Sequence, residues 1–309
     1  MKHTLKITLI LLTLFLSTQL IGLLVINQYS PQVKEVQNLN GTFINKTTYN
    51  LPYSLDPPEN TSPGSSLISI IFALIFAVFL MLFLIKFKVE HILRTWFFIV
   101  IVLSIAITLN SFMLGLQYSQ IIALILAFPL AFLKVFKRNI IVHNLTELII
   151  YPGIASIFVP ILTIWSVILL LIFISIYDMY AVWHAGFMQK MAKYQIQKLR
   201  IFSGFFIPYL GKKEKELYSQ LKRSNSKKSN KKVKLSVAIL GGGDVVFPII
   251  LAGVVFNNLG FFPAILISLG ATLALGFLFY MSKKGKFYPA MPFITIGCLL
   301  ALGIASLIN

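Results

Sequence analysis

Residues 163–183 read TIWSVILLLIFISIYDMYAVW, an apolar stretch that is interrupted by a single ionisable residue, Asp178. A helix needs about 20 predominantly apolar residues to cross roughly 30 Å of hydrocarbon, and this stretch is long enough. Eight further stretches meet the same criterion. The sequence therefore predicts an all-α polytopic membrane protein with nine transmembrane helices, at residues 5–26, 67–85, 95–114, 119–136, 140–160, 163–183, 235–255, 262–281 and 288–308.

The composition agrees with a membrane location. Of the 309 residues, 58% are hydrophobic and 12% are charged, and the mean hydropathy is +0.86. The net charge of +18 would suggest a nucleic-acid partner in a soluble chain, but no basic domain with its own core is visible, so we expect no nucleic acid. The single cysteine, Cys298, excludes an intrachain disulfide and a cysteine-based metal site. We expect neither a metal nor another cofactor.

The positive charges predict the orientation. All of the 27 Lys and Arg residues except Lys34 and Lys46 fall in segments that the nine spans would place on one side of the membrane. Positively charged loops face the cytoplasm. We therefore expect a cytoplasmic N-terminus and an external C-terminus at Asn309.

We divide the chain into three parts. Residues 1–183 hold six helices and an external loop at 27–66, whose prolines and lack of periodicity predict irregular structure. We expect residues 184–234 to form a flexible, basic cytoplasmic loop that begins as an amphipathic helix and contacts anionic membrane lipids at most. Residues 235–309 hold the last three helices.

Acidic residues inside predicted spans are the first candidates for function, because a charge in hydrocarbon is costly. Glu147 lies near the cytoplasmic end of its span, within reach of basic residues such as Lys137 or Arg138. We expect a structural ion pair there. His143, one helical turn earlier, is assigned the same role.

Asp178 and Asp244 are different, because neither of their spans contains a Lys or Arg that would neutralise them. They lie on consecutive, oppositely directed helices, roughly 8 and 14 Å from the cytoplasmic side. Two carboxyl groups in contact cannot both ionise cheaply, so they share one proton. Such a pair can deprotonate a bound water and protonate a leaving amide nitrogen.

Two intramembrane acids also suit a cation or proton transporter, or a leak channel, in which they would relay ions. Transporters often show repeated, interrupted spans, and here only the span at 235–255 is clearly interrupted. Three glycines at 241–243 precede Asp244, and Pro248 follows it. We expect the helix to bend or loosen at the acid, which leaves room for a substrate backbone.

A third feature is the sequence YPAMP at residues 288–292, at the start of the last span. Two prolines remove two main-chain donors and keep the stretch extended. Composition alone favours a simpler interpretation, a helix N-terminus. Small residues then recur every fourth position at Gly297, Ala301 and Ala305, a spacing that is typical of close helix packing.

Three motifs together resemble the signature of the presenilin and signal peptide peptidase class of intramembrane aspartyl proteases. They are Tyr177-Asp178, Gly241-Gly242-Gly243-Asp244 and Pro289-Ala290-Met291. The family patterns are Tyr-Asp, Gly-x-Gly-Asp and Pro-Ala-Leu, so only Met291 departs, by a swap of similar volume. The predicted orientation is similar to that of presenilins, and the length to that of archaeal homologues, which would place the protein in a prokaryotic cell membrane.

The resemblance implies an aspartic endopeptidase that cleaves within the membrane. Asp178 and Asp244 would be the catalytic dyad, with Tyr177 and the three glycines in support and residues 289–291 lining the active site. The substrates would be transmembrane helices of membrane proteins or leftover signal peptides. The resemblance implies no metal or cofactor. Prokaryotic relatives act without accessory subunits, and a homo-oligomer is compatible with the resemblance.

Overall fold

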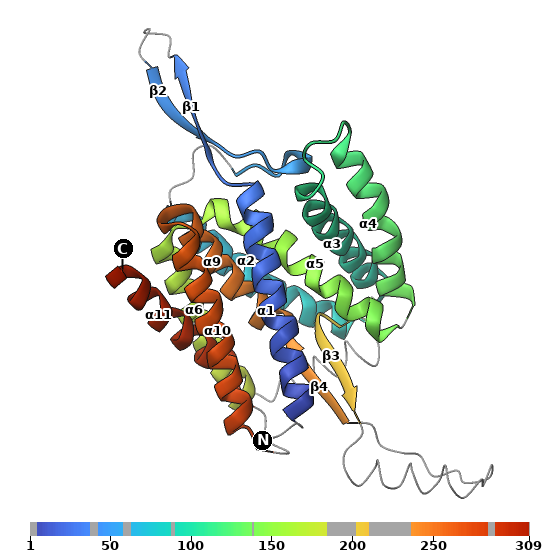
Figure 1. Cartoon of the computed structure of the whole chain (residues 1–309). Helices are drawn as coiled ribbons and strands as arrows, with labels where there is room; N and C mark the ends of the chain where they lie inside the picture. Colours follow the sequence, from blue (N-terminus) through green and yellow to red (C-terminus); the bar gives the residue numbers. More distant parts are fainter. Residues whose placement is uncertain are drawn as a thin grey trace, which may run out of the picture.

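The computed structural model describes residues 5–37, 43–57, 63–87, 90–137, 139–183, 202–209, 236–283 and 288–308. This part of the chain forms a bundle of long helices with a two-stranded sheet at each end (Figure 1). The helices are α1 (Leu5–Gln28), α2 (Pro63–Lys86), α3 (Glu90–Ser111), α4 (Ser119–Phe136), α5 (Ile140–Phe158), α6 (Ile164–Trp183), α9 (Gly242–Leu259), α10 (Phe261–Met281) and α11 (Met291–Ile308).

Each of the nine predicted spans corresponds to one of these helices. Eight of them are long and apolar enough to cross a membrane, and the corresponding apolar part of α2, Gly64–Leu80, is shorter. A short 3-10 turn, Val159–Ile161, continues α5 where the sequence places Pro160. The predicted class, a polytopic helical membrane protein, is confirmed.

Helix α9 is the centre of the bundle. It contacts α1, α5, α6, α10 and α11, and more of its length is buried than in any other described span. Small residues allow this crowding: the position of a Cβ on Gly22 of α1 lies 2.5 Å from Ile249 of α9, and that on Gly253 of α9 lies 2.5 Å from Ile26 of α1. The packing therefore holds α9 from several sides.

The span predicted at 235–255 is wrong in its boundaries. Residues Ser236–Gly241 form strand β4, and α9 begins only at Gly242. β4 pairs in antiparallel fashion with β3 (Gly204–Tyr209), with Gly204 opposite Gly241. A short apolar run can be a strand or a helix by hydrophobicity alone, and the glycines at 241–243 mark the point where β4 gives way to α9.

The two long loops also differ from the prediction. The segment 27–66 contains a hairpin of β1 (Gln32–Gln37) and β2 (Phe43–Thr48) that projects from the opposite end of the bundle to β3 and β4 (Figure 1). It also contains a 3-10 turn, Pro52–Ser54. The segment 184–234 contributes β3, and the rest of it, except residues 202 and 203, lies outside the described residues.

The small-residue stripe on the last span is a packing surface, as predicted. A Cβ on Gly270 of α10 would lie 2.6 Å from the carbonyl oxygen of Gly297 and 2.7 Å from Ala301. The two helices therefore touch backbone to backbone, an approach that only glycine allows.

We predict that Gly270→Ala lowers the thermal unfolding temperature in detergent, because the added methyl group meets main-chain atoms that cannot rotate away. The expected cost is about 1–3 kcal/mol. Gly303→Ala on α11 is the control, since no atom outside its own helix lies within 4 Å of that site. Equal unfolding temperatures for the two variants would contradict the close approach.

Candidate active site

Asp178 lies near the end of α6 and is 4% exposed. One of its carboxylate oxygens, Oδ2, accepts a hydrogen bond of 3.1 Å from the main-chain N–H of Met291. This contact joins the Tyr-Asp motif of the sixth span to the Pro-Ala-Met motif of the ninth. Tyr177, the preceding residue, is 39% exposed, so the two neighbours lie in different surroundings.

The hydroxyl groups of Ser175 and Thr295 form a second link between α6 and α11. Their oxygens are 2.8 Å apart, and both side chains are buried. Ser175 lies one turn before Asp178, and Thr295 one turn after Met291. Both are polar residues inside apolar spans, which can be seen in the sequence. Their pairing with each other depends on how α6 and α11 pack, which the sequence does not show.

Asp244 lies in the first turn of α9, immediately after β4. Its carboxylate turns back toward the end of the strand, where a Cβ on Gly241 would lie 3.2 Å from its Oδ2. The predicted irregularity before the acid is therefore a change from strand to helix. Pro248 follows one turn later within α9, so the carbonyl of Asp244 lacks its usual helical donor.

The two aspartates come together from neighbouring helices. α6 packs against α9, and both pack against α11. Asp178 and Asp244 are the only acidic residues of these three helices. The structure thus gathers the three motifs, which are far apart in sequence, in one region of the bundle.

The glycines before Asp244 have unequal roles. A Cβ on Gly242 would lie 2.8 Å from both the hydroxyl oxygen of Tyr151 and that of Ser203. A Cβ on Gly243 would make only an ordinary contact of 3.6 Å, with Phe247. The most crowded glycine is therefore the one that the Gly-x-Gly-Asp pattern leaves variable, a constraint that arises from Tyr151 on α5.

Residues 288–292 are partly non-helical and partly the start of a helix, so each interpretation of their sequence applies to one part of the stretch. Residues 288–290 are not helical, and α11 begins at Met291 with Pro292 in its first turn. Pro292 has no N–H to donate, but it costs little at the second residue of a helix. The N–H of Met291 remains available, and it bonds Asp178.

The predicted ion pair of Glu147 is present with another partner. Its Oε1 lies 2.6 Å from Nζ of Lys134, a residue inside α4. Lys137 lies beyond the end of that helix, and Arg138 is outside the described residues. Nε2 of His143 lies 3.6 Å from the same oxygen, as the prediction of a shared role requires.

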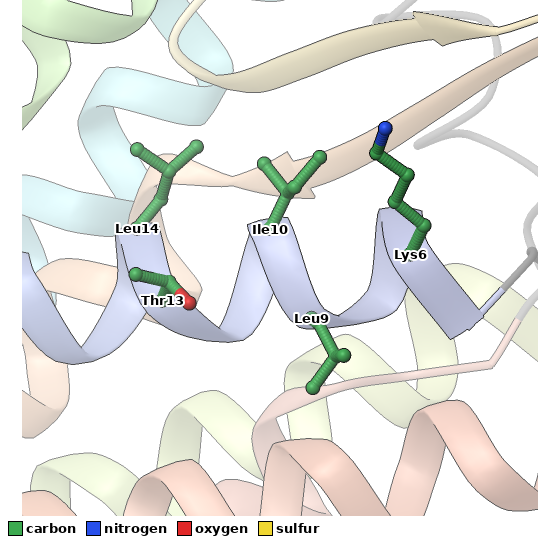
Figure 2. A pocket seen from close by; sticks show the side chains of 5 residues that line it. All are labelled: Lys6, Leu9, Ile10, Thr13 and Leu14. Atoms are coloured by element: carbon green, nitrogen blue, oxygen red, sulfur yellow. The ribbon is translucent and has the colours of Figure 1, made fainter.

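A surface pocket on α1 is separate from these residues. Figure 2 shows the side chains that line it, Lys6, Leu9, Ile10, Thr13 and Leu14, all of which belong to α1. Neither aspartate nor any residue of the three motifs lines it. Among the residues that the structure describes, no three His, Cys, Asp or Glu side chains are grouped as metal ligands.

The fold and the family comparison define a multi-pass intramembrane aspartic protease. Residues 45–309 match the family described as signal-peptide peptidase, presenilin aspartyl protease. Because this match covers most of the chain, the protein belongs to that family. It is an integral membrane enzyme, an aspartic endopeptidase.

Two solved structures, both described as a presenilin family intramembrane aspartate protease, share the fold. The one in space group C222 has a TM-score of 0.58 and 17% identity, with 98% of this chain and 99% of that chain covered. The one in space group P2 has the same TM-score and identity, with 97% of each chain covered. No curated protein matches the sequence significantly.

We predict that Gly242→Ala destabilises the protein and that Gly243→Ala does so much less. The buried ring of Tyr151, which is 1% exposed, cannot move away from a methyl group at position 242, and overpacking of this kind costs about 1–3 kcal/mol. Thermal unfolding of both variants in detergent measures the difference. A Gly242→Ala variant as stable as Gly243→Ala would refute the steric account.

Proposed function

We propose that Asp178 and Asp244 are the catalytic pair that hydrolyses peptide bonds within transmembrane segments. The observation that carries this assignment is the hydrogen bond from the Met291 N–H to Asp178, because it fixes one carboxyl group where α6, α9 and α11 meet. Asp244 approaches the same region from the first turn of α9. The helices α6, α9 and α11 carry no other acidic residue.

The chemistry follows from two carboxyl groups that share one proton. The unprotonated one takes a proton from a bound water, which attacks the scissile carbonyl, and the protonated one hydrogen-bonds to the carbonyl oxygen. The tetrahedral intermediate then collapses as a carboxyl group gives its proton to the leaving nitrogen. Water adds across the amide bond, so the products are a carboxylic acid and an amine, and no acyl-enzyme forms.

The substrate backbone would lie extended between β4 and residues 289–291. β4 leads directly to Asp244, and within the described residues only one of its edges is paired, with β3. The other edge can pair with an added strand through main-chain hydrogen bonds. A substrate helix would have to unwind locally, which frees the amide groups that this pairing requires.

The substrates we expect are single transmembrane helices of membrane proteins or leftover signal peptides, which enter laterally between spans. The excess of Lys and Arg on one side supports an active site toward the cytoplasm. We further propose that the protein contacts the surrounding membrane lipids and that it can bind a second copy of the chain in a homo-oligomer. The alternative function, an ion transporter that uses the same two acids, is not supported by the family match, which is to a family of proteases.

We predict that Asp178→Asn and Asp244→Asn each abolish cleavage of a transmembrane peptide, because an amide cannot shuttle the proton. General acid–base catalysis contributes about 10²–10⁴-fold, so kcat should fall by at least that factor. Asp56→Asn, in the loop near the β1–β2 hairpin, is the control and should retain activity. Cleavage by either single variant would refute the dyad. Proton flux into liposomes without cleavage by the wild type would favour the transporter.

We also predict that Met291→Pro lowers kcat by roughly 10–100-fold, since it removes the N–H that bonds Asp178. A hydrogen bond to a charged group contributes about 1.5–3 kcal/mol. Met291→Leu keeps the N–H and restores the family pattern, so it should cleave at the wild-type rate. Steady-state kinetics on the same peptide separate the two variants. Equal rates for Pro and Leu would show that this contact does not support catalysis.

A further inference from the structure

A cluster of polar side chains holds strand β3 from the side of α5. The cluster consists of Lys134 on α4 with His143, Asn144 and Glu147 on α5, and we call it the α5 clamp. Lys134 is 3% exposed and Glu147 is 1% exposed. Neither residue takes part in the catalytic mechanism proposed above.

The clamp binds the main chain of β3 at two alternate residues. Glu147 Oε1 accepts from the N–H of Gly204 at 3.2 Å, and His143 Nε2 lies 2.8 Å from the carbonyl oxygen of Gly204. Asn144 forms two hydrogen bonds of 3.0 Å with Phe206, one to its carbonyl oxygen and one from its N–H. Side chains of α5 thus take the place of a further strand on the edge of β3 that faces away from β4.

Stability alone explains this arrangement poorly. Burial of two charges costs several kcal/mol per ion, and an apolar pair of similar volume is often as stable or more stable. Glu147 Oε1 is shared among Lys134, Gly204 and His143. Lys134 keeps this carboxylate in place, and the carboxylate in turn keeps the end of β3 in place.

The contacts continue from β3 to the catalytic turn. Gly204 lies opposite Gly241 in the sheet, and the N–H of Gly242 donates to the carbonyl of Ser203 at 3.3 Å. Tyr151, one turn after Glu147 on α5, packs edge-on against Phe205 with ring centroids 5.9 Å apart. The same tyrosine limits the space at Gly242.

We infer that the α5 clamp is a positioning device for the reaction. It holds β3 in one register, β3 aligns β4, and β4 places Asp244 beside Asp178 while its outer edge fixes which peptide bond of the substrate reaches them. The inference rests on the proposed function of the two aspartates. It assigns positioning roles to Lys134, Asn144 and Glu147, which lie outside the three motifs.

Two variants weaken the clamp in different ways. Asn144→Ala removes both bonds to Phe206. The double variant Lys134→Met with Glu147→Leu removes the charges together, so no buried charge remains unpaired, and the acceptor for Gly204 is lost. Thr146→Val is the matched control, because among the described residues this buried hydroxyl bonds only carbonyl groups of its own helix, those of Val142 and His143.

The experiment measures kcat, KM, thermal unfolding and the cleavage positions by mass spectrometry of the products of one transmembrane peptide. We expect both clamp variants to lower kcat by about 10–100-fold, as misplacement of reacting groups by about 1 Å does. Cleavage should spread to neighbouring peptide bonds. The double variant should unfold at a somewhat lower temperature, because the buried N–H of Gly204 loses its acceptor, so rates are compared at a temperature where every variant is folded. Thr146→Val should keep the wild-type rate and cleavage positions.

Two results would overturn the inference. One is a wild-type rate and product pattern for both clamp variants. The other is a loss of activity that follows the loss of folded protein while the cleavage positions stay unchanged, as a purely structural role requires. Asp178→Asn in the same assay keeps the two proposals apart: if it cleaves, the dyad has failed, whereas if it is inactive and the clamp variants match the wild type, only the clamp has failed.

Discussion

A polar group in hydrocarbon must find its partner within the protein, because the lipid offers none, and much of this structure follows from that constraint. Asp178 is partnered by the N–H of Met291, a group left free at the first residue of α11. Glu147 is partnered by Lys134 and by the end of β3. In both cases an acidic side chain joins two elements that are far apart in sequence.

The same constraint explains why a strand lies next to a helix in the middle of the site. The main-chain groups of β4 are paired by β3, and those of β3 are paired on the other edge by side chains of α5. In the proposed function, the edge of β4 that no described strand pairs would receive the backbone of an unwound substrate.

The helical spans and the site motifs could be predicted because their signals are local. An apolar run of about 20 residues specifies a span, and the scarcity of acids makes Asp178 and Asp244 conspicuous. Strand β4 could not be predicted, since an apolar run as short as Ser236–Gly241 fits a strand and the start of a helix equally well. The partner of Glu147 was missed because the direction of the Lys134 side chain depends on how α4 packs on α5.

Other contacts depend on tertiary structure in the same way. Asn144 has several groups within reach in any helix, and only the position of β3 determines that it bonds Phe206. The crowding at Gly242 comes from Tyr151, which is distant in sequence. Spacing along the chain carries no information about either contact, so residues that position the site are harder to predict than the residues of its motifs.

The roles of the two aspartates can be tested by a structure of the wild-type protein with a peptide in which a hydroxyethylene group replaces the scissile amide. Such a group mimics the tetrahedral intermediate. If the two aspartates are the catalytic pair, the hydroxyl will lie within hydrogen-bond distance of both Asp178 and Asp244, with the peptide extended along β4. A hydroxyl bound away from either carboxyl group, or a peptide that remains helical beside them, would contradict this assignment.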